Sequence, residues 1–172
     1  MNTYQCLNDI ITKDERKQLL YEVKNIKVWD DYSDTSNLKV VSTGKGTLPL
    51  KGLVKKLINK VNPKLKFWIA DFIKFAPKKG IVVHKDDLPG RTSCITWALS
   101  PSLDKFSPIK YYDENEKFVE EVYYKEKPLI ITTQNNHNCF NDSEENRYTF
   151  QICFYDKIEK LVELDQKGKL FI

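Results

Sequence analysis

Both histidines of this 172-residue chain stand where they could bind a metal ion. His84 and Asp86 follow the apolar run Ile81–Val83, and because side chains in a strand alternate between faces, the two would point the same way. His137 comes much later, after a second strand-like run, Leu129–Thr133. Two imidazoles and one carboxylate on one wall form a facial triad, which leaves the other positions around a divalent metal ion open.

A basic residue completes the pattern. Arg147 follows His137 by ten positions and opens a third strand-like stretch, and the hydroxyl of Thr149 comes two residues later. A His-x-Asp pair, a long gap, a distal histidine and an arginine, in this order, resemble the motif of the Fe(II)- and 2-oxoglutarate-dependent dioxygenase superfamily, in particular its small prolyl-hydroxylase-like members. The resemblance covers about residues 66–155, roughly half of the chain.

The resemblance implies a role for each of these residues. It assigns catalysis and Fe(II) binding to three of them, His84, Asp86 and His137. Arg147 and Thr149 would hold the cosubstrate 2-oxoglutarate, with Thr96 beside them, because a planar guanidinium matches a carboxylate in a bidentate pair. With dioxygen as the second cosubstrate, the implied reaction hydroxylates a peptidyl side chain or a small molecule and releases succinate and CO2.

Two further positions bear on the substrate. The alkylated-base demethylases of this superfamily carry a second arginine six residues after the first, where this chain has Cys153, so a nucleic-acid substrate is not expected. Arg91 lies seven residues after His84, which resembles an arginine near the mouth of the site in prolyl-hydroxylase-like members. Arg91 is therefore a candidate substrate contact, and an ordinary surface arginine is the equal alternative.

Other interpretations of the same residues stay open. A non-catalytic cupin-like module would keep the fold and bind a metal or ligand without oxidation. In an interaction protein the histidines would be incidental, with Lys85, Asp86 and Asp87 in a solvated turn before Pro89-Gly90. Cys139, two residues after His137, is another potential ligand, which we discount because the His-x-Asp pair already completes the triad.

The composition is that of a globular protein, with 41% hydrophobic and 30% charged residues, and this length predicts one domain over residues 1–172. The four cysteines form no CxxC pair, and polar residues rather than an apolar segment follow Met1. We therefore expect a cytoplasmic protein with reduced thiols. A net charge of +4 is too small to predict nucleic-acid binding. No apolar run approaches the ~20 residues of a membrane span, and the oligomeric state is left open.

Helices are expected in the first part of the chain, about residues 1–65, as a support for the strands that follow. A capping box, Thr12-x-x-Glu15, predicts a helix from about Lys13 to Asn25. Apolar residues at three- and four-residue spacing predict a second helix from Leu50 to Asn62, with lysines on its solvated face.

The segment between the two helices is polar and rich in turn residues, so we expect Trp29–Thr47 to be a loop. Its string Gly44–Thr47 lacks the glycine spacing of a phosphate-binding loop and follows no apolar strand.

Short runs rich in β-branched and aromatic residues predict strands over about residues 66–156. These runs are Phe67–Phe75, Ile81–His84, Ser93–Leu99, Ile109–Tyr112, Phe118–Tyr124, Leu129–Thr133 and Tyr148–Tyr155. Two helices before about seven strands, together with the resemblance, predict a mainly β fold, a double-stranded β-helix of the jelly-roll or cupin-like kind with N-terminal helices packed on one sheet. In the last run, aromatic and aliphatic residues alternate with Arg147 and Thr149, so the apolar face should lie under the helices and the polar face in a cavity.

Overall fold

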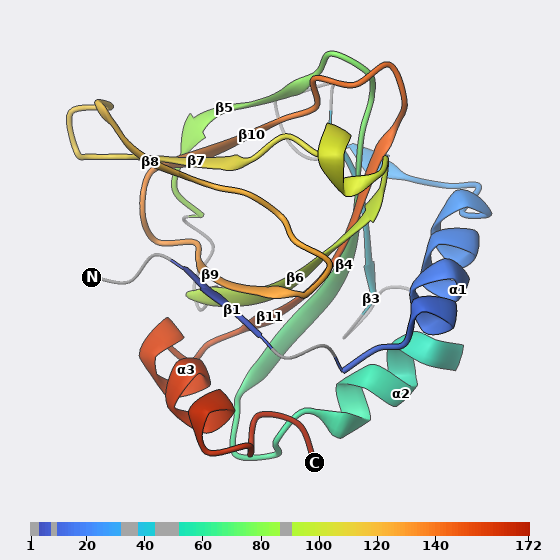
Figure 1. Ribbon diagram of the computed structural model, residues 1–172, viewed down its shortest axis with the longest axis vertical. Helices are drawn as coiled ribbons and strands as arrows, with labels where there is room; N and C mark the ends of the chain where they lie inside the picture. The colour runs from blue at the N-terminus through green and yellow to red at the C-terminus, as the bar shows by residue number, and fades with distance from the viewer. Residues whose placement is uncertain (1–3, 8–9, 32–37, 44–51, 87–90) are drawn as a thin grey trace.

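The computed structural model describes residues 4–7, 10–31, 38–43, 52–86 and 91–172. Within these ranges the chain forms two antiparallel sheets, three α-helices and one short 3-10 helix, which confirms the expectation of a mainly β fold (Figure 1). The helices are α1 (Lys13–Lys24), α2 (Gly52–Lys60), α3 (Ile158–Gln166) and the 3-10 helix η1 (Leu103–Lys105).

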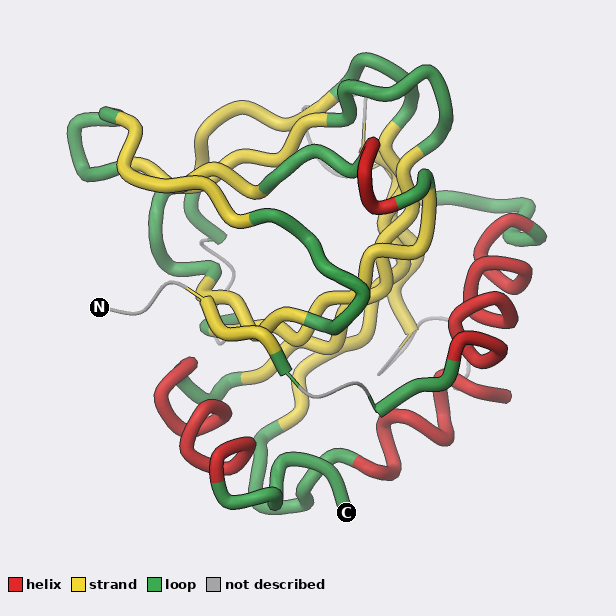
Figure 2. Tube along the Cα trace, in the orientation of Figure 1, coloured by secondary structure: helices red, strands yellow, loops and turns green. Residues whose placement is uncertain are grey.

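Among the described residues the larger sheet has seven strands and the smaller sheet has four. The larger sheet has the order β1 (Tyr4–Cys6), β9 (Leu129–Thr132), β6 (Ser93–Ser100), β11 (Arg147–Phe154), β4 (Phe67–Phe75), β3 (Leu38–Thr43) and β2 (Asp30–Asp31). The smaller sheet has the order β5 (Gly80–His84), β10 (His137–Phe140), β7 (Ile109–Tyr112) and β8 (Phe118–Val122). Between β4 and β11 the chain passes back and forth between the sheets, so that the two layers face each other (Figure 2).

The central strand β11 faces the helix-covered core on one side and the space between the two sheets on the other. Its apolar side chains, Tyr148, Phe150, Ile152 and Phe154, belong to one core cluster with residues of all three α-helices. Leu19 of α1, Leu57 of α2 and Leu161 of α3 are fully buried in that cluster. The alternate residues of β11 point to the space between the sheets, as the sequence pattern predicts.

The capping box at α1 forms as expected. The Thr12 hydroxyl accepts a hydrogen bond from the Glu15 backbone N–H at 3.1 Å, and the Glu15 carboxylate accepts one from the Thr12 N–H at 2.9 Å. Both bonds satisfy backbone donors that the first turn leaves without a partner, which fixes the start of the helix at Lys13. In α2 the predicted stripe is also buried, with Leu53, Val54 and Leu57 inward.

Several elements differ from the sequence prediction. The expected loop Trp29–Thr47 contains β2 and β3, because β3 pairs with residues Ala70–Phe75 of β4. The short, polar β10 forms because β5 and β7 flank it on both sides. The sequence prediction also omitted β1 and α3. The string Gly44–Thr47 and the Pro89-Gly90 turn lie outside the described residues.

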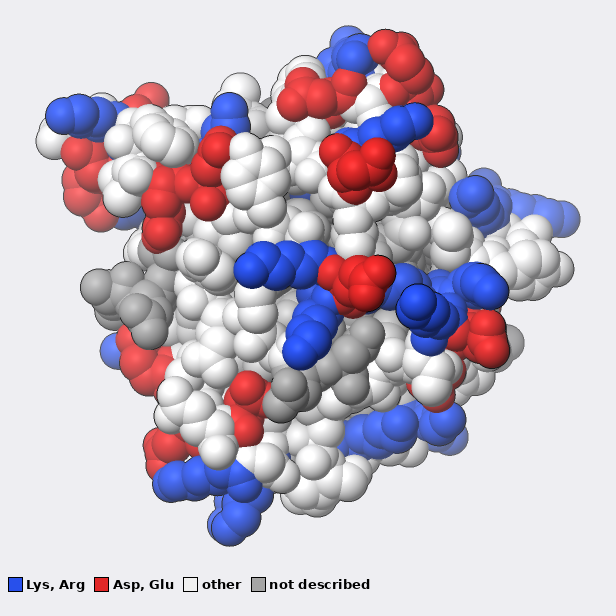
Figure 3. All heavy atoms as spheres, viewed as in Figure 1, with Lys and Arg blue, Asp and Glu red and all other residues white. Residues whose placement is uncertain are grey.

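None of the helices in the described ranges is long and apolar enough to cross a membrane. On the face shown in Figure 3, basic and acidic side chains are interspersed, in keeping with the small net charge. Lys55 and Lys56 of α2 are exposed, and Lys56 pairs with Glu15 of α1 at 2.7 Å. The lysines of α2 therefore form a solvated helix face, as expected.

Candidate metal centre

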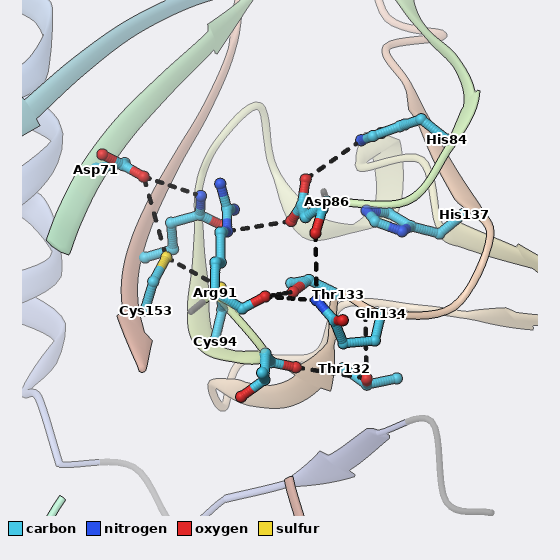
Figure 4. Close-up of polar contacts among 12 residues, drawn as sticks. Asp71, His84, Asp86, Arg91, Cys94, Thr132, Thr133, Gln134, His137 and Cys153 are labelled. Atoms are coloured by element: carbon cyan, nitrogen blue, oxygen red, sulfur yellow. Dashed lines mark hydrogen bonds and ion pairs between the residues drawn. The ribbon is translucent and has the colours of Figure 1, made fainter. Parts of the chain in front are cut away.

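The structure brings together the three residues of the expected triad. His84 ends β5, His137 begins β10, and the two are directly opposite each other where these strands pair. Their ring centroids are 4.5 Å apart. Asp86 follows β5, and one potential ligand atom from each of the three residues lies within 4.8 Å of the others (Figure 4).

Hydrogen bonds to the backbone prepare both imidazoles for metal binding. The Nδ1 atom of His84 lies 2.9 Å from the Val82 carbonyl oxygen, and that of His137 lies 2.8 Å from the Asn135 carbonyl oxygen. Because a carbonyl oxygen can only accept, each Nδ1 must donate its proton. In the neutral ring the lone pair is then on Nε2, which is how metal-binding histidines are usually oriented.

The electrostatics of the centre favour a cation. Burial opposes a charge on His84, but the Asp86 carboxylate, with Oδ1 at 3.6 Å from His84 Nε2, and the Val82 carbonyl oxygen together outweigh burial and raise the pKa of His84. Burial would raise the pKa of Asp86, but His84 and the guanidinium of Arg91 lower it, so the carboxylate stays ionised. Burial lowers the pKa of His137 to about 4, which keeps this imidazole neutral near pH 7. Two nitrogen donors and one anionic oxygen donor form a set that suits Fe(II).

The expected cosubstrate arginine lies in the same cavity. Arg147 is only 1% exposed, and its Nη1 donates to the Phe140 carbonyl oxygen at 2.7 Å. Its guanidinium carbon lies 4.1 Å from the ring centroid of Phe106 and 5.2 Å from that of Tyr124. Among the described residues, Arg147 Nε has no hydrogen-bond partner. A buried donor without an acceptor is costly, so a carboxylate in the cavity would stabilise this arginine.

All the site residues expected from the sequence line one cavity between the sheets. Its walls include His84, Asp86, Arg91, Thr96, His137, Arg147 and Thr149, together with Asp71, Ile73, Phe75, Ile81, Ile109, Tyr124, Ile131, Thr133, Cys139 and Gln151. The triad, Arg147 and the two threonines therefore share one site, although they come from four separate stretches of the chain.

No sequence model of a known protein family matches this chain. No curated protein matches it by sequence. Among solved structures it is similar to a prolyl-4-hydroxylase from Pseudomonas putida, with a TM-score of 0.66 and 10% identity over 90% of this chain and 92% of that one. It is also similar to a prolyl hydroxylase from Trichoplax adhaerens, solved in complex with a hypoxia inducible factor peptide fragment. The TM-score is 0.63 and the sequence identity 17%, over 95% of this chain and 87% of that one. A third similar structure is a non-haem α-ketoglutarate-dependent carbocyclase from nogalamycin biosynthesis. Its TM-score is 0.60 and its sequence identity 11%, over 88% of this chain and 79% of that one.

The fold is that of the 2-oxoglutarate- and Fe(II)-dependent oxygenases. In this oxygenase fold, Arg91 is a buried residue with only 8% of its surface exposed, so the alternative of an ordinary surface arginine is wrong. Its Nε lies 3.1 Å from Asp86 Oδ2, an ion pair inside the cavity. The guanidinium is held there because Asp86 and Asp71 attract it and the Trp68 ring lies 6.0 Å away. A contact between Arg91 and substrate stays a prediction.

Two cavity residues escaped the sequence analysis. Burial raises the pKa of Tyr124 to about 12, so its phenol remains a hydrogen-bond donor beside Arg147. Nothing in the sequence separates Tyr124 from its neighbour Tyr123, which is exposed. Asp71 is 3% exposed and accepts from Gln151 at 3.4 Å. Asp71 could have been found from the sequence, because a charged residue in the middle of an apolar strand indicates a buried polar site.

Cys139 also lines the cavity, but its chemistry differs from that of the triad. Burial raises the pKa of its thiol, which keeps the sulfur protonated. The potential ligand atoms that lie within 4.8 Å of one another come from His84, Asp86 and His137 and do not include the Cys139 sulfur. Cys139 is therefore a wall residue, in agreement with its omission from the expected ligand set.

Proposed function

We propose that this protein is an Fe(II)- and 2-oxoglutarate-dependent dioxygenase of the prolyl-hydroxylase-like kind. One observation carries the proposal: three ligand atoms within 4.8 Å of one another share a cavity with a buried arginine that has an unused donor. Fold similarity alone supports only the architecture, whereas this combination of residues is what the chemistry requires.

Each residue contributes a distinct part of the proposed site. His84, Asp86 and His137 would hold Fe(II) through two Nε2 atoms and a carboxylate oxygen, which leaves coordination positions open for cosubstrates. Arg147 would bind the distal carboxylate of 2-oxoglutarate, held in place by aromatic rings on its faces. Thr149, two residues along the same strand, would add a hydroxyl on the cavity wall, and Thr96 would line the neighbouring strand β6.

The cofactor supplies the oxidising chemistry: with 2-oxoglutarate and dioxygen, Fe(II) couples oxidative decarboxylation to substrate hydroxylation, releasing succinate and CO2. The protein contributes binding, orientation and exclusion of water. The low exposure of Asp86, His137 and Arg147 serves the last of these, because few water molecules can reach the reacting atoms.

Two substrate classes agree with the fold. The Trichoplax enzyme was solved with a peptide fragment, and the carbocyclase belongs to the biosynthesis of nogalamycin. We propose hydroxylation of a peptidyl side chain or of a small molecule for this chain. We do not propose a nucleic-acid substrate, because Cys153 stands where the alkylated-base demethylases of the superfamily carry a second arginine.

The test is conversion of 2-oxoglutarate to succinate by the purified protein with Fe(II) and oxygen. We expect succinate formation that depends on Fe(II), is lost in His137→Ala and increases with a substrate that gains one oxygen atom. Peptide and small-molecule panels, read by mass spectrometry, would separate the two substrate classes. Metal and 2-oxoglutarate binding with no succinate above the His137→Ala background would contradict an oxygenase and support a cupin-like binding module instead.

A further inference from the structure

The turn that precedes His137 is tied directly to the segment that carries Asp86. The Asp86 backbone N–H donates to the Thr133 carbonyl oxygen at 3.0 Å. The Thr133 hydroxyl donates to the Arg91 carbonyl oxygen at 3.1 Å. These bonds connect two ligand-bearing segments that are far apart in the chain (Figure 4).

Gln134 makes this connection with its side chain. Its Nε2 donates to the Asp86 carbonyl oxygen at 3.2 Å and to the Arg91 carbonyl oxygen at 2.6 Å. A primary amide has two N–H groups, so both bonds can form at the same time. One side chain therefore holds the backbone at both Asp86 and Arg91.

The backbone positions of Asp86 and Arg91 together determine the orientation of the Asp86 carboxylate. Arg91 Nε lies 3.1 Å from Oδ2, whereas His84 Nε2 lies 3.6 Å from Oδ1. The two oxygens therefore have different neighbours, with Oδ1 on the side of the imidazoles. A shift of the backbone at either Asp86 or Arg91 would change this orientation.

We propose that Gln134 is a positioning residue of the metal centre: by holding the backbone at Asp86 and Arg91, it directs Asp86 Oδ1 toward the metal position. This role rests on the proposed function only through the metal site. Gln134 itself does not touch the metal position, and it acts through Asp86 and Arg91. Outer partners of metal ligands usually contribute about 10- to 100-fold to metal affinity.

The test compares Gln134→Met and Gln134→Ser with Gln18→Met. Methionine keeps the length of the side chain without the donors, and serine is too short to reach either carbonyl. Gln18 is also an exposed glutamine, on α1, so Gln18→Met controls for the exchange itself. Binding of Mn(II), an oxygen-stable substitute for Fe(II), is measured by calorimetry, and the thermal midpoint of each metal-free protein is measured in parallel.

We expect both Gln134 variants to bind Mn(II) about tenfold more weakly than wild type. Because Gln134 is exposed, their thermal midpoints should stay near that of Gln18→Met, which should bind Mn(II) like wild type. Wild-type affinity in Gln134→Met, with or without a lower thermal midpoint, would overturn this inference alone. A wild-type protein that binds no Mn(II) would overturn the proposed function as well.

Discussion

His137 begins a strand, is 6% exposed and presents Nε2 to the other two triad residues. His137→Ala should weaken Mn(II) binding by more than about 100-fold, because loss of a ligand costs more than loss of an outer partner. Calorimetric titration measures the effect. Cys139→Ala, in the same strand, should keep the wild-type affinity for Mn(II). An unchanged Mn(II) affinity in His137→Ala would contradict the assigned metal site.

The buried neutral state of His137 also makes the stability of the metal-free protein depend on pH. Burial lowers its pKa from 6.5 to about 4, so the unfolded chain takes up the proton first as the pH falls. A histidine with a lowered pKa contributes stability that is complete above pH 6.5 and is lost toward pH 4, here on the order of 2–3 kcal/mol.

Urea unfolding of wild type and His137→Gln, at pH 7 and near pH 4.5, tests whether stability falls with pH as expected. The free-energy difference between the two proteins should shift in favour of the variant at the lower pH. The opposite effect of His84, whose pKa is raised, is present in both proteins and largely cancels. A constant difference across this range would contradict the buried neutral imidazole.

Arg147 tests the cosubstrate half of the site. Arg147→Lys keeps the charge but loses the planar fork, so 2-oxoglutarate binding should weaken by about 10- to 100-fold, the equivalent of a charge-assisted hydrogen bond. Affinity for Mn(II) alone should stay within about twofold of wild type, because Arg147 is not a triad residue. Calorimetry with the Mn(II)-loaded protein measures both, and equal loss of metal and 2-oxoglutarate binding would point to general misfolding.

At this scale the sequence predicted the residues whose chemical types are rare and whose spacing is regular. His84, Asp86, His137, Arg147, Thr149 and Thr96 all line the cavity. Gln134 and Tyr124 could not be found, because their contacts involve main-chain atoms or aromatic faces that many residue types can make. The burial of Arg91 also depends on residues distant in the chain.

The pairing of β5 with β10 is the element that positions both histidines. Gly80 begins β5, and a Cβ there would lie 2.5 Å from the Cys139 carbonyl oxygen and 2.8 Å from the Phe140 Cα. Backbone atoms cannot yield locally, so the strands would separate. We expect Gly80→Ala to destabilise the protein by about 1–3 kcal/mol and to weaken Mn(II) binding, because His84 and His137 pair across these strands.

Gly168→Ala is the matched control, since an added Cβ there meets nothing within 4 Å. Its φ of +61° makes alanine strained, which should cost about 1–2 kcal/mol without changing metal affinity. Thermal unfolding and Mn(II) calorimetry on both variants distinguish a local backbone cost from displacement of the metal centre. Equal metal affinity in the two variants would contradict the role of strand pairing.

Elements encoded by local signals were predicted well. The capping box located the start of α1, and β-branched runs located most core strands to within a residue or two. The strands β3 and β10 were not predicted. β10 is short, β3 lies inside a polar, turn-rich segment, and pairing with distant neighbours stabilises both. The helix α3, which follows β11, was not predicted from the sequence, although its residues Ile158 and Leu161 are buried.

The larger sheet has the helix-covered core cluster on one face and, on the other, the site cavity beside a second apolar cluster that includes Ile109, Tyr111 and Leu129. All three α-helices pack against the outer face of the larger sheet, and the smaller sheet covers the inner face (Figure 1). The cavity therefore lies between the two sheets, on the face of the larger sheet that the α-helices do not cover. One domain over residues 1–172, with helical support before residue 65 and the β-helix up to about residue 156, remains our proposal for the whole chain.

The central claim is that metal and 2-oxoglutarate occupy one cavity. Under anaerobic conditions, calorimetric titration of 2-oxoglutarate into metal-free and Mn(II)-loaded wild-type protein tests it directly. We predict binding at least about tenfold tighter to the Mn(II)-loaded form, equivalent to about 1.4 kcal/mol of coupling between the two ligands. Equal affinity in both forms, or no binding in either, would contradict a shared site.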